Sequence, residues 1–364
     1  MKYEYWFAAI QGLTDEKKLL LRSYMKSGKD IYYIEETMLT KLSFINEKDV
    51  ERILRAKEQW NLKKEYEKLL QKQIRVIYCY EDLYPRKLLN IPDPPYALYV
   101  KGNLPDENKK SIAIVGARKC TPYGEKHACV FAQRLAEQNV QIISGLAHGI
   151  DGFAHRGALF GKGKTFAVLG NGVDICYPRE HIGLYTDILE NGGGILSELP
   201  PGSSPLPRHF PKRNRIISGL SEAVLVMEAK EKSGSLITAD MALEQGKDVY
   251  ALPGMIDNPL SAGCHHLIRQ GAGILISAEN MLEELKICPE KGITKKLSEI
   301  VEEKKVLESD EDLVYSTFAV CSKNANEIID ETGLPAEQVM RCLVSLEIQG
   351  YIKEISKNHY LKIK

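Results

Sequence analysis

One stretch of the sequence concentrates cations and an aromatic ring without any acidic residue. Residues 199–221 read LPPGSSPLPRHFPKRNRIISGLS and contain no Asp or Glu. Its cations are Arg208, Lys212, Arg213 and Arg215, and Phe210 and His209 lie among them. Cations that hold phosphates beside a ring that can stack on a base are the elements of single-strand recognition. The stretch therefore predicts contacts to single-stranded nucleic acid.

Two further segments carry cations directly after apolar runs. In IAIVGARKCTPYG, Arg118 and Lys119 follow the run, and no acid occurs between Glu107 and Glu125. In GNGVDICYPRE, Arg179 follows a Tyr-Pro turn. We expect these cations to join the basic stretch in one phosphate-binding groove.

Small residues end several of the apolar runs and open the helices that follow. Glycine allows a ligand to approach the backbone closely, and a turn at a helix start presents N–H groups to an anion. Any one of these turns is also explained by tight chain reversal alone, but that reading leaves the accompanying Arg, Lys and Ser unexplained. The residues predicted to contact phosphate through backbone or hydroxyl groups are Gly116, Ser144, Gly145, Gly170, Gly172, Ser233, Gly234 and Ser235.

Two patterns typical of enzymes are weak here. Residues 158–165, ALFGKGKT, approach a phosphate-binding loop but lack its first glycine and precede a strand. No GxGxxG follows the first strand of the central region, so a dinucleotide site is not indicated. His148, Asp151 and His155 could form a metal or acid–base cluster, but we expect a structural role, with Asp151 capping a helix.

Two alternatives to DNA binding stay open. A nucleotide-binding or nucleotide-hydrolysing enzyme would need a carboxylate base, which Glu198, Asp151 or Glu228 could supply. An adaptor with a vestigial pocket would bind partners and no DNA. We favour DNA binding without turnover, and we predict no catalytic residue, no metal and no cofactor.

The elements that must position these residues alternate between strand and helix. The predicted central domain spans residues 74–287. Over residues 111–287, short apolar runs (IAIVG, VQIISG, FAVLG, GGILSE, AVLVMEA, DVYALPG, GILISA) alternate with helical patterns, the first from about Pro122 and the second from about Asp151. Near-continuous apolar strands separated by helices indicate a doubly wound, mostly parallel α/β sheet. Such sheets bind ligands at the carboxyl ends of their strands. Before them, Ile74 to Tyr80 reads as a strand, and Ile91-Pro92-Asp93-Pro94-Pro95 as extended chain.

Smaller units flank this region. Residues 1–72 are predicted to form a helical module, 288–308 a charged linker, and 309–364 a winged helix. In the last unit, a helix of about 326–332, a turn at Gly333, a helix over 336–349 and two short strands follow one another. Because the second helix carries Glu337 and Glu347 as well as Arg341, we favour a structural or partner-binding role there over DNA reading.

Composition excludes some classes of protein. Lys plus Arg and Asp plus Glu both number 49 among 364 residues, so the chain as a whole does not coat polyanions. No two of the eight cysteines have the CxxC spacing of a zinc ribbon or redox site. No signal peptide and no membrane-spanning apolar run is evident, and we expect a cytoplasmic protein with reduced thiols and no membrane contact.

At these residues the sequence closely resembles the DNA-processing protein A family, also called DprA or Smf. The matching stretches are IAIVGARKCTPYG (112–124), SGLAHGIDGFAHRGAL (144–159), FAVLGNGVDICYPRE (166–180), ILSELPPG (195–202), FPKRNRIISGLS (210–221), VMEAKEKSGSLITADMALEQGKDVYALPG (226–254) and GCHHLIRQGA (263–272). Upstream, YPRKLLNIPDPPYALYVKG (84–102) also matches. His265 stands where many relatives have Asn.

The resemblance implies an extended Rossmann-like fold between an N-terminal SAM-like module and a C-terminal winged helix. It implies that the chain binds and protects single-stranded DNA and loads the RecA recombinase onto it during natural transformation. It also implies a homodimer formed through the Rossmann-like domain. The family's basic pocket corresponds to Arg118, Arg179, Arg213 and Arg215, with the SGL and SGS turns at the same strand ends.

Overall fold

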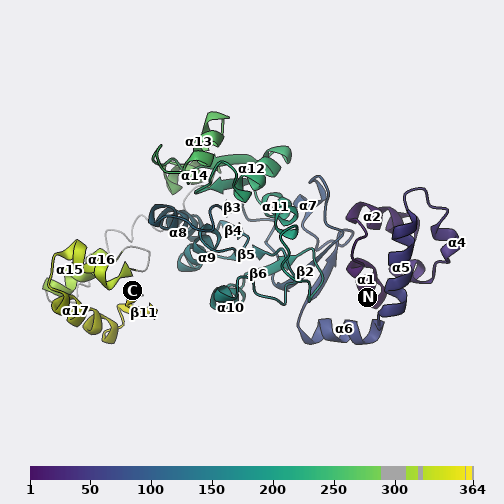
Figure 1. Cartoon of the computed structure of the whole chain (residues 1–364), viewed down its shortest axis with the longest axis horizontal. Coiled ribbons are helices and arrows are strands. Elements are labelled where there is room, and N and C mark those ends of the chain that lie inside the picture. The colour runs from purple at the N-terminus through teal and green to yellow at the C-terminus, as the bar shows by residue number, and fades with distance from the viewer. Residues whose placement is uncertain (288–308, 319–322, 357, 363–364) are drawn as a thin grey trace.

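A computed structural model describes residues 1–287, 309–318, 323–356 and 358–362 of the chain (Figure 1). The predicted linker, 288–308, lies outside the described residues. In the part of the chain that is described, no helix is both long and apolar enough to cross a membrane.

A nine-stranded sheet forms the centre of the molecule, in the order β1-β2-β6-β5-β4-β3-β7-β8-β9. Strands β3 to β9 run parallel, and β1 and β2 add an antiparallel edge. The strands are β1 (Arg75–Tyr78), β2 (Ala97–Gly102), β3 (Ser111–Val115), β4 (Gln141–Ser144), β5 (Thr165–Val168), β6 (Gly194–Ser197), β7 (Ala223–Val226), β8 (Asp248–Ala251) and β9 (Gly273–Ile274).

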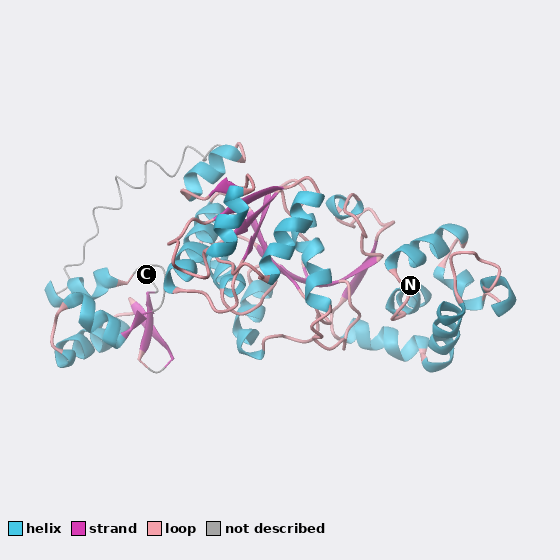
Figure 2. Cartoon of the chain, turned by 45° about the horizontal axis from the view of Figure 1, so that its top comes forward, coloured by secondary structure: helices cyan, strands magenta, loops and turns pink. Residues whose placement is uncertain are grey.

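Helices cover both faces of this sheet (Figures 1 and 2). They are α7 (Arg86–Leu89), α8 (Pro122–Glu137), α9 (Ile150–Phe160), the short helix η1 (Arg179–His181), α10 (Ile182–Glu190), α11 (His209–Gly219), α12 (Gly234–Glu244), α13 (Ala262–Arg269) and α14 (Ala278–Glu284). Strand β3 shows why two layers form, because its side chains alternate between faces. Ala113 and Val115 join the core with α11, α12 and α13, whereas Ile112 and Ile114 join the core with α8, α9 and α14.

The N-terminal module packs against the antiparallel edge of the sheet. It comprises α1 (Lys2–Ala9), α2 (Asp15–Tyr24), α3 (Gly28–Tyr33), α4 (Glu36–Leu39), α5 (Glu47–Gln59) and α6 (Leu62–Gln71). Trp6 and Phe7 are fully buried in its core, which Tyr78 and Tyr96 join from the sheet side. The rings of Tyr5 and Tyr99 meet edge to face, with centroids 6.2 Å apart. Buried aromatic contacts of this kind hold the module on the sheet.

The C-terminal unit contains α15 (Ser309–Thr317), α16 (Ala325–Thr332), α17 (Ala336–Ile348) and a small sheet of β10 (Lys323–Asn324), β12 (His359–Lys362) and β11 (Ile352–Ser356). Gly333 ends α16 in the left-handed conformation, with φ of 66°, and Pro335 precedes α17. This tight turn joins the two helices as a winged helix requires.

The predicted fold class is confirmed, and each strand expected between 111 and 276 is present. Two elements escaped the sequence patterns. No strand was predicted after the extended chain of Ile91–Pro95, but β2 follows there and pairs with both β1 and β6. The short helix α7 precedes the prolines. Strand pairing supplies the backbone partners that fix β2, and a local pattern does not show such a partner.

Candidate nucleic-acid interface

A cavity of about 450 Å³ opens where the strand order of the sheet reverses. Strand β3 has β4 on one side and β7 on the other, and the loops beyond these strands diverge. Its walls come from the loop after β3, the start of α9, the loop before η1, and the helices α11 and α12. This is the position at which doubly wound sheets hold their ligands.

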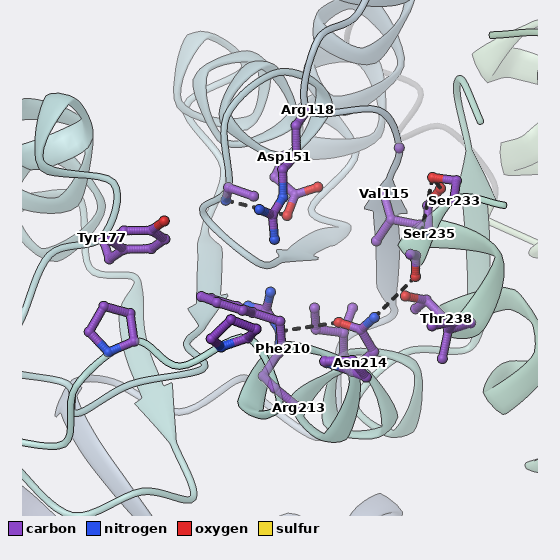
Figure 3. A pocket seen from close by; sticks show the side chains of 18 residues that line it. Val115, Arg118, Asp151, Tyr177, Phe210, Arg213, Asn214, Ser233, Ser235 and Thr238 are labelled. Atoms are coloured by element: carbon purple, nitrogen blue, oxygen red, sulfur yellow. Dashed lines mark hydrogen bonds between the residues drawn. The ribbon is translucent and has the colours of Figure 1, made fainter. Parts of the chain in front are cut away.

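A cation and two aromatic rings frame one side of the cavity (Figure 3). The guanidinium carbon of the exposed Arg118 lies 5.3 Å from the ring centre of Phe210. The rings of Phe210 and Tyr177 are 5.7 Å apart, with an interplanar angle of 32°. Gly170 lies under Phe210, since a Cβ there would be 2.8 Å from its Cδ1. The ring is therefore supported from below, with Arg118 close to it.

Arg213 and Asp151 form the buried floor of the cavity. Nη1 of Arg213 donates to the carbonyl of Gly145 at 2.9 Å and also to that of Val168. Burial lowers the pKa of Arg213 to about 10, while Asp151 opposes the shift, so Arg213 stays charged at neutral pH. Burial also raises the pKa of Asp151 against the opposing effect of Arg213 and of the amides of Gly145 and Ala147. These two charges largely offset each other, so Arg118 is the cation of the cavity lining that is left for a ligand.

Hydroxyl groups surround the N-terminus of α12 on the other side of the cavity (Figure 3). The side chain of Ser233 caps the helix by accepting from the amide of Ser235, and their hydroxyls are 2.8 Å apart. Thr238 lines the cavity one turn further along, and Asn214 reaches across from α11 to the carbonyl of Gly234 at 3.3 Å. A helix start with hydroxyls and backbone donors suits a phosphate.

Two predicted cations point away from the cavity. Arg215 binds Glu198 through two bonds of 2.8 and 3.2 Å and Asp93 through Nε at 3.2 Å. Nζ of Lys212 lies 3.1 Å from Glu198 and 3.2 Å from Asp15. Neither residue lines the cavity, whereas Arg213 does. Arg213 and Arg215 therefore point to different sides of α11, and DNA contacts by Lys212 and Arg215 stay predictions.

The other predicted residues divide into two groups. Gly116, Arg118, Phe210, Arg213, Ser233, Gly234 and Ser235 line the cavity, whereas Lys119, Ser144, Gly145, Gly170, Gly172 and Arg179 do not. Lys119 and Arg179 are exposed beside lining residues. Ser144 is buried and donates to the carbonyl of Ile114 at 2.7 Å, and the amide of Gly145 donates to Asp151. The Ser144 hydroxyl and the Gly145 amide are therefore engaged within the protein.

Comparison with known proteins decides the family. A family model for DNA recombination-mediator protein A matches residues 75–286. The chain belongs to this family. Protein Smf from Escherichia coli is 41% identical over 285 residues, which cover 75% of this chain and 74% of that protein. DNA processing protein DprA from Bacillus subtilis is 42% identical over 244 residues, covering 64% and 81% of the two chains.

Two solved structures of DNA processing protein A share the fold of this family member. The protein from Streptococcus pneumoniae is 38% identical, with a TM-score of 0.67, and the match covers 78% of this chain and 98% of that one. The protein from Helicobacter pylori is 30% identical, with a TM-score of 0.53, covering 58% and 95%. The latter structure addresses how that protein binds single-stranded DNA.

The carboxylates considered for an enzyme have internal partners in this DprA family member. Glu228 accepts from the amide and hydroxyl of Thr121 at 2.8 and 2.5 Å. Glu198 is paired with Lys212 and Arg215 outside the cavity, so Asp151 alone of the three lines it.

The possible cluster of His148, Asp151 and His155, which the sequence did not favour, does not assemble. His148 lies 3.9 Å from Glu180, and the buried His155 contacts Thr165. Asp151 has the expected structural role, but the helix-capping prediction was wrong: Gly149 is the N-cap of α9, and Asp151 ties down the preceding loop. Within the described residues, no group of His, Cys, Asp and Glu could hold a metal.

Sequence reasoning missed three aromatic or polar side chains in the lining of this site: Tyr177, Asn214 and Thr238. The position of Tyr177 directly before Pro178 and Arg179 was the available signal, because an aromatic beside a cation suits strand binding. His265, which stands where the resemblance leads us to expect Asn, donates through Nε2 to the carbonyl of Gly254, 3.0 Å away. It lies outside the cavity lining.

Proposed function

We propose that this chain binds and protects single-stranded DNA without chemical turnover and delivers it to the RecA recombinase during transformation and recombination. The observation that carries the proposal is the pairing of Arg118 with the supported ring of Phe210 at the cavity mouth. A phosphate beside Arg118 and a base against the ring satisfy both halves of a nucleotide. Membership of the family and the similarity to the Helicobacter pylori protein, whose structure concerns single-stranded DNA binding, support the same function.

In this mechanism, Phe210 and Tyr177 stack one or two bases, and phosphates lie at Arg118 and at the hydroxyl-rich start of α12. Arg213 and Asp151 form the floor that holds the loops in place. Because every base has a π face, sequence preference is slight. Because bound phosphates release counterions, affinity falls as salt rises.

A homodimer through the Rossmann-like domain is part of the proposal. The loops after β8 and β9 expose Met255 (76%), Ile256 (94%) and Ile276 (78%), and Ile274 is also half exposed. Several exposed apolar side chains in neighbouring loops are typical of an interface. The molar mass of the purified chain, measured by light scattering, tests this dimer.

We place the activity of the protein in the cytoplasm, where it meets DNA and the recombinase.

The decisive experiment is fluorescence anisotropy of single-stranded and double-stranded oligonucleotides of equal length over a salt series. We expect tighter binding of the single strand, with an affinity that falls linearly on logarithmic axes. Equal binding of both forms contradicts the proposal.

The same samples, incubated with nucleoside monophosphates, test the enzyme alternative: turnover that is lost in Asp151→Asn would favour an enzyme. Binding of RecA without any DNA shift would instead indicate an adaptor.

A further inference from the structure

Helix α11 has two functional faces. One face carries Phe210, Arg213 and Asn214 into the cavity. The other carries Lys212 and Arg215, which meet carboxylates from three other segments. The position of the cavity wall therefore depends on what holds the second face.

The second face is held by a compact ion-pair cluster. Its members are Asp15 on α2, Asp93 in the loop before β2, Glu198 after β6, and Lys212 and Arg215 on α11. Arg215 is 6% exposed, and both it and Lys212 contact Glu198 at 2.8 and 3.1 Å. The side chains of Arg215, Glu198 and Asp15 are largely buried, whereas those of Lys212 and Asp93 are about half exposed. Because breaking a buried pair leaves an uncompensated charge, the three buried members favour a fixed geometry of the elements that carry them.

Asp15 is the member that the N-terminal module contributes. Its Oδ2 lies 3.2 Å from Nζ of Lys212 and 3.8 Å from Nη2 of Arg215. Beside it, Nζ of the buried Lys18 donates to the carbonyl of Ala8 at 2.6 Å, which ties the same turn of α2 to α1. The ion pair therefore joins the module to the cavity-lining helix.

We propose that Asp15 is a positioning residue for DNA binding, through which the N-terminal module holds α11 with Phe210 and Arg213 facing the cavity. This inference rests on the proposed function. Asp15 touches no ligand itself, and Lys212 acts through Asp15 and Glu198 and not on a phosphate. Without Asp15, Arg215 keeps Glu198 and Asp93, so α11 stays charge-compensated but loses these two ion pairs with the module.

The test measures binding of fluorescent oligothymidylate by the full chain over a salt series. We expect Asp15→Asn to raise Kd by about fivefold because a less fixed wall costs ordering on binding. The slope of log K against log salt should not change, since no phosphate contact is removed. Glu16→Gln, on the same helix, exposed and outside the cluster, is the matched control and should bind as the wild type does. Asp15→Glu should restore most of the loss.

A double-mutant cycle separates positioning from general destabilisation. If Asp15 acts through α11, the effect of Asp15→Asn should shrink to less than about twofold in a Phe210→Ala background. Lys212→Gln breaks the Asp15–Lys212 ion pair from the side of α11. Because it leaves α2 unchanged, it replaces Asp15→Asn in this test if Asp15→Asn unfolds at a much lower temperature than the wild type. It too should weaken binding without changing the salt slope.

The outcomes are distinct. If the wild type binds no oligothymidylate, the proposed function fails. If the wild type binds and both variants bind as tightly or more tightly, this inference alone is overturned. A salt slope lowered by about one in Lys212→Gln also overturns it, because Lys212 would then contact a phosphate.

Discussion

The guanidinium of Arg118 lies over the ring of Phe210, 5.3 Å from its centre, although 92 positions of sequence separate the two residues. Arg118 extends from the loop after β3, and Phe210 lies in the first turn of α11. Each is anchored by its own loop or helix, so the pair is present before any ligand arrives. Preorganised contacts of this type lower the ordering cost of binding.

Replacing Arg118 by Ala should weaken binding of single-stranded DNA by about tenfold, because one charged contact is lost. The loss should be similar for all base sequences, and the salt slope should fall by about one. Anisotropy with homopolymers at several salt concentrations measures both. Arg134→Ala, an exposed cation near the end of α8 that pairs with Glu137, is the control and should have no effect.

Replacing Phe210 by Ala should cost about 1–3 kcal/mol of binding free energy if one base stacks on its ring. In contrast to Arg118→Ala, the salt slope should stay unchanged. Phe160, an exposed phenylalanine at the end of α9, provides the matched Phe160→Ala control. Equal affinities of the two variants would show that Phe210 stacks no base.

Two glycines at helix starts should respond to alanine in opposite ways. Gly149 has φ of +71°, and a Cβ there would lie 2.3 Å from the carbonyl oxygen of Ala117 and 2.6 Å from that of Arg118. We expect Gly149→Ala to lower the free energy of unfolding by more than about 1 kcal/mol and to displace the Arg118 loop. Urea unfolding and DNA binding measure the two effects.

Gly183 in α10 is the matched case, because a Cβ there meets nothing within 4 Å. Gly183→Ala should leave DNA binding intact and stabilise the fold by about 0.5–1 kcal/mol. A loss of stability in Gly183→Ala as large as that in Gly149→Ala would mean that backbone conformation and space at these positions do not decide the outcome.

Acid should destabilise the fold through His155. The hydroxyl of Thr165 donates to the carbonyl of Ile142 and so accepts from Nδ1 of His155 at 2.7 Å. The other ring nitrogen of His155, Nε2, is buried, and the described residues offer it no hydrogen-bond partner. Burial lowers the pKa of His155 to about 3, with His181 and Arg213 acting in the same direction. The ring is therefore neutral in the folded protein.

The sign of the pH effect follows from this lowered pKa. The unfolded chain binds the proton near pH 6.5, so the contribution of His155 is complete above that pH. It is lost towards pH 3, at up to about 1.4 kcal/mol per pH unit. Urea unfolding between pH 7.5 and 5.5 should show a shallower decline for His155→Leu than for the wild type. Parallel declines would exclude His155 as a source of acid sensitivity.

The amino-acid sequence by itself determined the layered α/β fold and the region of the site. Apolar runs flanked by glycines at IAIVG, VQIISG and FAVLG can be satisfied only by buried parallel strands, because both faces of each strand are apolar. Parallel strands place their following turns at one edge, so the loops bearing Arg118 and Ser233 were expected to converge. Local pattern was sufficient here because these apolar runs are too short for helices and are bounded by glycines and by longer stretches of helical period.

Only the tertiary structure decided which cations face the cavity. Lys212, Arg213 and Arg215 share one acid-free stretch, but two of them are engaged by carboxylates outside it: Glu198, directly before the stretch, and the remote Asp15 and Asp93. Asp15 precedes Lys212 by 197 positions, and nothing near either residue indicates the other. Side-chain direction on α11 is set by packing and by buried charge pairs, which depend on long-range contacts. The basic stretch thus contributes Arg213 to the cavity, and Lys212 and Arg215 to the contact between the N-terminal module and the sheet.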